Sequence, residues 1–199
     1  VEIAAGAKFD AVARGWGWTT KTGEFSHEIR GSRYTSEDIS AAHPETYAPG
    51  AGGHLTGNAC GAGYGGFGDR YSSNGGRKYG YQYAPFLPGS CGYAQASRGA
   101  GAIWIECGGQ FTLNGTRDAS GSALATGRAN TSGGGIWVSA MGFAAGSQAQ
   151  LLASGGSTPG SSYGAAGGRI ALVLATSAED RDALARGETP AGLTYDSTI

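Results

Sequence analysis

The sequence predicts an all-β fold: a short parallel β-solenoid of the β-helix type, with a glycine-rich, polyproline-II-like sector and a short C-terminal helix. Three observations support this prediction. Glycine supplies 39 of the 199 residues, against a usual share of roughly 7%. An apolar strand pattern recurs along the chain, and the pattern near the C-terminus changes to that of a helix. Because the glycines alternate with aromatic and aliphatic residues, they indicate a folded chain and not a flexible linker.

A motif of small residues followed by alternating apolar residues occurs three times. The copies are Gly101-Ala-Ile-Trp-Ile105, Gly134-Gly-Ile-Trp-Val138 and Gly168-Arg-Ile-Ala-Leu172. Their first isoleucines are 33 and 34 residues apart. Such a period is typical of stacked architectures, in which each unit buries its apolar face against its neighbours, and alternation with a period of two indicates strands. A weaker element follows the first two motifs, and residues 1–11 look like a further copy of it.

We expect a single domain over residues 1–199 with five consecutive parts. These parts are the first strands (1–23), a charged surface excursion (24–49), a sector densest in glycine and aromatic residues (50–100), the solenoid repeats (101–175), and a helical cap with a tail (176–199). In the last part, Ser177 can cap the first turn of a helix and Gly187 can end it. This helix would cover the strand edges at the end of the solenoid.

Charge and motif content exclude several classes of partner. Fourteen basic against fifteen acidic residues leave a net charge of −1, so we expect no nucleic-acid binding. The longest apolar run, residues 170–175, is far too short to span a bilayer. No P-loop, zinc-protease or serine-hydrolase motif is present. Gly63-Tyr-Gly-Gly-Phe-Gly68 matches a dinucleotide-binding pattern only through glycine content, because no strand precedes it and no helix follows. We expect no cofactor.

The three cysteines have no C-x-x-C spacing, so we expect no zinc site. Cys60 and Cys91 both lie in the glycine-rich sector, where a disulfide between them would compensate for a thin core. Sequence does not fix the geometry of such a bond, and two reduced thiols are the open alternative. Cys107 ends an apolar run and is expected to be a small buried hydrophobic residue. The three histidines, at positions 27, 43 and 54, are expected in exposed loops and not in a metal site.

Aromatic and basic residues gather between positions 64 and 83 and form the best candidate binding surface. Its members are Tyr64, Phe67, Tyr71, Arg77, Lys78, Tyr79, Tyr81 and Tyr83. Flat rings with polar groups between them can stack on sugars or contact another protein chain. The alternative is structural: the rings cover a glycine-rich core that has few other side chains to bury.

The chain resembles the glycine-rich repeat regions of very large bacterial surface and secreted proteins, familiar from Verrucomicrobia-like and Planctomycetes-like genomes. The resemblance spans residues 50–175 and rests on the repeated motifs, above all Gly61-Ala-Gly-Tyr-Gly-Gly-Phe-Gly68, Gly99-Ala-Gly-Ala-Ile-Trp-Ile105 and Gly133-Gly-Gly-Ile-Trp-Val138. It implies an extracellular or cell-surface location and a structural or adhesive role. The cysteine pair and the charged insert depart from a simple uninterrupted array.

We therefore expect an extracellular structural or adhesive module and not an enzyme. The strand-like residues 1–9 and the stackable period favour end-to-end association into a fibre or stalk, with further copies or with other surface chains. A carbohydrate-binding module that uses the aromatic cluster is one alternative. A polysaccharide-degrading enzyme is another, because parallel β-helices often host such enzymes. Its acid and base would come from Asp69, Glu106, Asp118, Arg77 or Lys78, among which no pair has diagnostic spacing.

Overall fold

The computed structural model describes residues 1–16, 49–52, 54–55, 58–69, 75–92, 98–122, 130–157 and 164–190. These residues form nine strands and one helix. The elements are β1 (Glu2–Ile3), β2 (Lys8–Asp10), β3 (His54–Leu55), β4 (Asn58–Ala59), β5 (Ile103–Leu113), β6 (Thr116–Asp118), β7 (Gly135–Ala145), β8 (Gln150–Leu152), β9 (Arg169–Leu174) and α1 (Ala178–Ala185). Seven of the strands lie in two parallel sheets, and β3 and β4 form a separate antiparallel pair.

The larger sheet has the strand order β1-β5-β7-β9, and all its strands are parallel. The three apolar motifs of the sequence are neighbouring strands in this sheet. Ile103 is paired with Ile136, which is paired with Ile170. The spacing of 33 and 34 residues is therefore the length of chain that leads from one strand to the next.

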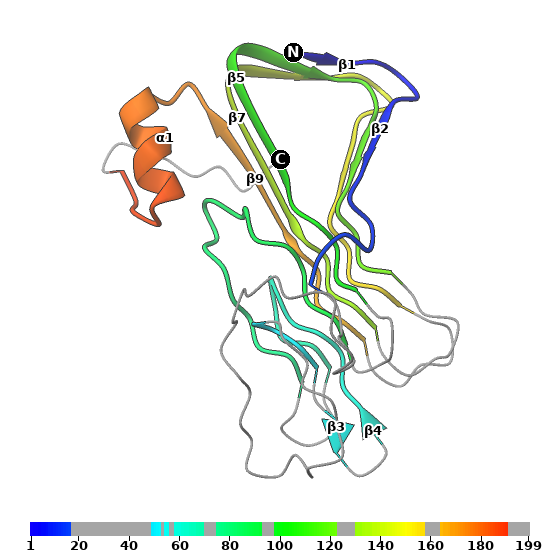
Figure 1. The fold of residues 1–199 in the computed structure, drawn as a ribbon. Helices are drawn as coiled ribbons and strands as arrows, with labels where there is room; N and C mark the ends of the chain where they lie inside the picture. The colour runs from blue at the N-terminus through cyan, green and yellow to red at the C-terminus, as the bar shows by residue number, and fades with distance from the viewer. Residues whose placement is uncertain are drawn as a thin grey trace, which may run out of the picture.

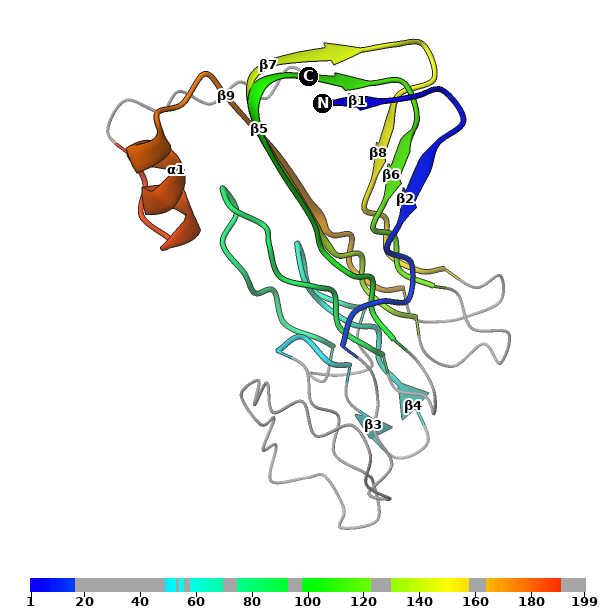
Figure 2. The ribbon, with the colours of Figure 1, turned by 45° about the horizontal axis from the view of Figure 1, so that its top comes forward.

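The smaller parallel sheet has the order β2-β6-β8 and stands opposite the larger one. In the larger sheet, the register between β5 and β7 shifts between Cys107 and Gln110, where Gly108 and Gly109 face Met141 alone. Such a bulge bends a strand, and β5 and β7 turn sharply where they bear it (Figure 1). The two arms of these strands and the smaller sheet enclose a three-sided core, which Figure 2 shows from a second direction.

The inner core fills the space between the two sheets. The rows that continue from β5 to β7 are apolar, such as Ile103 with Ile136 and Phe111 with Phe143, whose rings lie 5.9 Å apart. Alternation along each strand sends every second side chain to this side. The burial of this face against the smaller sheet is the main source of stability that we identify in the repeats.

The outer face of the larger sheet carries a second core. Trp137 and Val173 of this face are buried together with Ala84 and with Leu184 of α1. The helix begins as the sequence predicts: the Ser177 Oγ accepts a hydrogen bond from the Asp180 amide at 3.0 Å. It ends at Gly187, which has a positive φ of 82°. The prediction of a short C-terminal helix is thus confirmed.

The predicted fold class, an all-β β-solenoid with a polyproline-II-like sector, is wrong. The structure combines two parallel sheets of seven strands with a helix, which is an α/β-type arrangement. The physical reason is the strand partner that β9 lacks in the smaller sheet. After Leu174 the chain forms α1 and not a further strand, and this helix buries Leu184 against the outer face. The helix is thus part of the core and not a cap on the end of a stack.

The glycine-rich sector is held together by backbone contacts between distant segments. Among its described residues, β3 and β4 are the only strands between positions 49 and 92. Gly63 donates its amide hydrogen to the carbonyl of Gly50 at 2.8 Å, and Gly76 donates to Gly61 at 2.9 Å. A Cβ atom added at Gly61 would collide with the carbonyl oxygen of Gly164. Glycine is required here because only its missing side chain lets the segments approach this closely.

The predicted disulfide between Cys60 and Cys91 is not formed: both residues, like Cys107, are buried thiols. The backbone of Gly52 explains why. Its amide donates to the Cys91 carbonyl at 3.2 Å, and its Cα lies against the Cys60 carbonyl. A third segment is therefore packed between the two that carry the cysteines. The predicted surface excursion at 24–49 lies outside the described residues, except for its last position.

Two glycines of one motif test whether close backbone approach stabilises the sector. We expect Gly61→Ala to lower the free energy of unfolding by about 1–3 kcal/mol or more, because the backbone of Gly164 must move. Gly66→Ala is the matched control: its nearest contact would be the Ala166 Cβ at 3.9 Å, so its effect should stay within about 1 kcal/mol. Urea unfolding measures both variants. Equal destabilisation by the two would contradict this account.

Candidate functional site

The structure separates the predicted aromatic and basic residues into three groups. The first group is internal. Tyr64 is fully buried, and its ring lies 4.6 Å from that of the half-buried Tyr79. The Tyr79 hydroxyl donates to the Pro88 carbonyl at 2.6 Å and accepts from the Ser90 hydroxyl at 2.9 Å. Burial raises the pKa of both phenols. These two rings hold the glycine-rich sector together, as the structural alternative proposes.

The second group lies over the outer face of the larger sheet. Tyr81 and Tyr83 meet edge to face with ring centroids 5.4 Å apart, and both pack against the core that contains Trp137. The Tyr81 hydroxyl is hydrogen-bonded to that of Thr189, just beyond α1. These rings therefore join the glycine-rich sector to the helix.

The third group is exposed and small. The Phe67 side chain is 64% exposed, and the Lys78 Nζ lies 5.9 Å from the centre of its ring. Arg77 is also exposed, and Tyr71 lies outside the described residues. The eight predicted residues therefore do not form one binding surface, because two of the rings are internal and two are packed beside the helix.

A different set of exposed apolar side chains gathers at the edges of the two parallel sheets, and the motif search did not identify it. Among the described residues, the exposed large hydrophobic side chains are those of Val1, Phe9, Phe67, Trp104, Met141, Ile170 and Leu174. Four of them, Val1, Phe9, Ile170 and Leu174, belong to the first and last strand segments of the sheets. The alternation of inner and outer faces along each strand is the sequence signal that identifies them.

The outer edge of β9, which we call the β9 edge, leaves part of the inner face uncovered. Ile170 and Leu174 alternate with Leu172, which packs against the inner core, so all three lie on the inner side. Ile170 is 43% and Leu174 is 40% exposed. No described strand pairs with β9 on the side away from β7.

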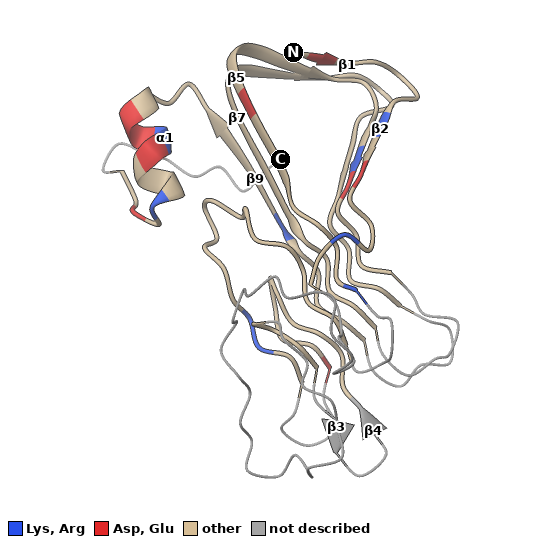
Figure 3. Cartoon of the chain, viewed as in Figure 1, with Lys and Arg blue, Asp and Glu red and all other residues tan. Residues whose placement is uncertain are grey.

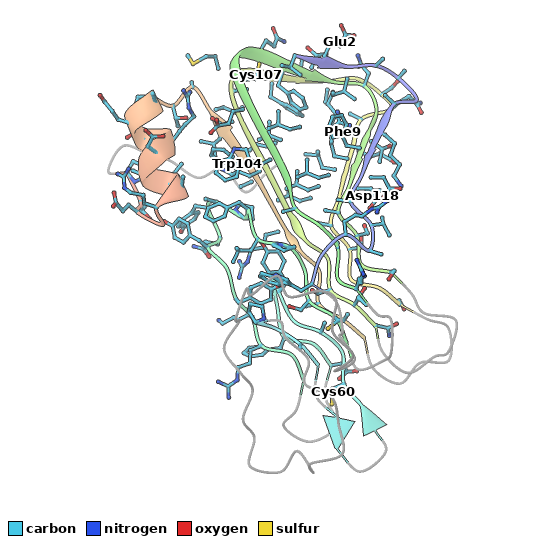
Figure 4. The ribbon with its side chains drawn as sticks, in the orientation of Figure 1. Glu2, Phe9, Cys60, Trp104, Cys107 and Asp118 are labelled. Atoms are coloured by element: carbon cyan, nitrogen blue, oxygen red, sulfur yellow. The ribbon has the colours of Figure 1, made fainter. Side chains whose placement is uncertain are left out.

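The opposite boundary, which we call the β1–β2 edge, is also apolar on its inner side. Ile3 packs against the inner core, whereas Val1 is 61% and Phe9 is 52% exposed. Figure 4 shows Phe9 on the inner side of β2 and Trp104 on the outer side of the larger sheet. β1 pairs only with Thr112 and Leu113 of β5. The Ile103–Cys107 part of β5 therefore has no described strand on the side away from β7.

A buried arginine lies directly behind Phe9. The Arg117 guanidinium is fully buried, and its carbon lies 4.1 Å from the centre of the Phe9 ring. Its Nη1 donates to the Thr116 carbonyl at 2.7 Å, whereas Nε and Nη2 have no hydrogen-bond partner among the described residues. Phe9 thus shields a charged group from solvent at the boundary of the molecule.

The outer side of the smaller sheet carries an ion-pair network that joins β2 to β6 (Figure 3). The Lys8 Nζ lies 3.0 Å from the Asp118 Oδ2 and 3.4 Å from the Asp10 Oδ2. Its hydrogen bond with Asp118 raises the pKa of Lys8. Burial acts to raise the pKa of Asp118, but hydrogen bonds from Ser120 and Lys8 outweigh it and lower that pKa. The network favours the ionised forms and ties the short strand β2 to the sheet.

The residues considered for catalysis do not come together. Glu106 is on the outer side of the larger sheet and Asp118 on the outer side of the smaller one, so they face away from each other. The described part of the chain holds no group of three or more metal-ligating side chains. It also holds no helix long and apolar enough to cross a membrane. Comparisons of the chain with protein-family models, curated proteins and solved structures find no significant match.

Tyr79 gives a direct test of its structural role. We expect Tyr79→Phe to lower the free energy of unfolding by about 1–3 kcal/mol, because the Pro88 carbonyl loses its donor in a partly buried position. Tyr81→Phe should change it by less than about 0.5 kcal/mol, because water can replace the exposed bond to Thr189. Urea unfolding compares the two. An unchanged stability of Tyr79→Phe would return this ring to the list of binding candidates.

The Lys8–Asp118 pair predicts a pH dependence of stability. Because the folded state lowers the pKa of Asp118, the pair stabilises the fold at pH values above about 3.9. This contribution is lost as the pH falls through the lowered pKa of the folded state. Wild type should thus be more stable than Asp118→Asn at pH 7 but not near pH 2, as measured by urea unfolding. In a Lys8→Met background the difference at pH 7 should shrink, and a difference independent of pH would contradict the assignment.

Proposed function

We propose that this chain is a structural module of an extracellular or surface protein and that it assembles end to end through the open edges of its two parallel sheets. The observation that carries the proposal is the exposure of inner-face apolar side chains at both boundaries, at Ile170 and Leu174 on one side and at Val1 and Phe9 on the other. The extracellular part of the proposal rests on the resemblance of the glycine-rich motifs.

The chemistry of the two edges supports association with protein. An uncovered strand offers a row of backbone donors and acceptors that another strand can pair with. At the β9 edge this row is combined with aliphatic side chains that gain free energy when they leave water. No lysine or proline lies within β9 to discourage such pairing.

The direction of the strands supports an open chain of copies. Every strand of the two sheets runs parallel to its neighbours, so the two boundaries present strands of the same direction. The boundaries are different surfaces, and joining one to the other is a head-to-tail contact. Head-to-tail contacts that do not close into a ring generate filaments. A fibre or stalk is the form that this arrangement favours.

Charge substitution at the β9 edge tests the proposal. We expect the double variant Ile170→Glu, Leu174→Glu to weaken self-association by roughly 100-fold or more, because the contact would have to bury two carboxylates in place of two aliphatic side chains. Sedimentation velocity over a concentration series and negative-stain microscopy measure the assemblies. The stability of the single copy should change little, since both side chains are exposed.

The matched control is Phe67→Glu, which places a carboxylate at an equally exposed apolar position away from both edges. It should assemble as wild type does. The proposal fails if wild type stays a single small particle at every concentration and salt tested. It also fails if Phe67→Glu abolishes assembly as fully as the edge variant does.

A further inference from the structure

The two parallel sheets are built in layers, and the two boundary layers are incomplete. A full layer consists of one strand of the larger sheet and the strand of the smaller sheet that follows it: β5 with β6, and β7 with β8. β1 and β2 form only the second part of a layer, because β1 begins beside Thr112. β9 forms only the first part, because it pairs with Gly135–Ala140 of β7 and then leaves the sheet for α1.

What each boundary layer lacks is what the other supplies. Through the register of β5 and β7, β9 occupies the positions of residues up to Cys107, since Leu174 pairs with Ala140, which pairs with Cys107. Through the same register, β1 occupies the positions of Thr112 and Leu113, and β2 those of Thr116–Asp118. No register position is filled by both partial layers. Together they make one layer of the same extent as β5 with β6.

We propose that in the assembly a β9 of one copy and the β1–β2 of the next copy share one layer. This inference rests on the proposed function and specifies its contact. β9 then lies between β7 of its own copy and the open Ile103–Cys107 stretch of the next copy's β5. In the same layer, β1 and β2 cover Gly142–Ala145 of β7 and Gln150–Leu152 of β8, which β9 leaves open.

The side chains that meet in the shared layer are matched. Continuing the register places Ile170 beside Ile103, and Phe9 beside the partly buried Leu151. Both contacts extend apolar rows of the inner core across the junction. On the outer face, the 47% exposed Trp104 would stand beside Ala171. A small residue at this position leaves room for an indole ring that would otherwise meet Trp137 directly.

The shared layer fixes the length that each copy adds. A copy contributes two full layers and two halves of a shared one, hence three layers per repeat. Neighbouring strands lie about 4.8 Å apart, so the axial repeat of the assembly should be roughly 14 Å. Contacts through another surface have no reason to give this value.

Cysteine pairs that face each other only across the junction test the shared layer. Lys8 and Gln150 are both exposed on the outer side of the smaller sheet, in the same register row as Thr116. Within one copy they are two strands apart, about 10 Å, which is too far for a disulfide. Across the junction they become nearest neighbours. We expect the variant Lys8→Cys, Gln150→Cys to form a ladder of covalent multimers under mild oxidation, seen on a denaturing gel without reductant.

Three controls make the result specific. Each single variant should give dimers at most, and a mixture of the two single variants should give a dimer that contains one of each. The pair Lys8→Cys, Gln148→Cys, with the second cysteine in the turn before β8, is exposed but out of register and should give no ladder. A second matched pair, Glu2→Cys with Ala144→Cys, meets in the Thr112 row and should reproduce the ladder without altering the Lys8 ion pairs.

The outcomes separate this contact from the proposed function. Ladders from the two matched pairs alone, with a repeat near 14 Å by cryo-electron microscopy, support the shared layer. Wild-type assembly without these ladders, or equal ladders from the out-of-register pair, overturns the shared layer and leaves end-to-end assembly standing. Absence of both assembly and ladders overturns both proposals.

Discussion

The parallel pairing of β5 with β7 is the constraint on which the rest of the structure depends. It sets Ile103 beside Ile136 and continues to Ile170 in β9, so a single register decides which side chains face inward over the whole sheet. A slip of one residue would turn every inner side chain outward. The inner core, the outer core beneath α1 and the apolar edges all follow from this one alignment.

The sequence predicts the strands better than it predicts what covers them. Period-two alternation and the spacing of three isoleucines identify β5, β7 and β9 and their neighbours, and Ser177 with Gly187 identifies α1. The role of that helix is not predictable in the same way. Only Leu184 is buried in α1, so its sequence carries almost no amphipathic pattern to show which surface it covers. The fold class depends on this contact, and it is therefore where the prediction failed.

The candidate site shows the same limit in a different form. Tyrosine suits a binding surface and a thin core equally well, because it has a large apolar ring and a polar tip. Which role Tyr64 and Tyr79 take depends on backbone contacts among segments such as Gly50, Gly63 and Gly76, which have no periodic signal in sequence. Cys60 and Cys91 are kept apart by a third such segment at Gly52. Contacts between glycines leave no trace in side-chain patterns, so the sequence cannot order these segments.

Arg117 shows why the β1–β2 edge is a meaningful boundary and not merely the start of the sheets. A buried guanidinium without an acidic partner is costly, and its cover determines that cost. Here the cover is Phe9, which lies on a strand of three residues and is itself half exposed. A strand this short has little pairing of its own to hold it in place. A neighbouring strand packed against β2 would press Phe9 onto Arg117, so the same contact that buries an exposed ring would also protect a buried charge.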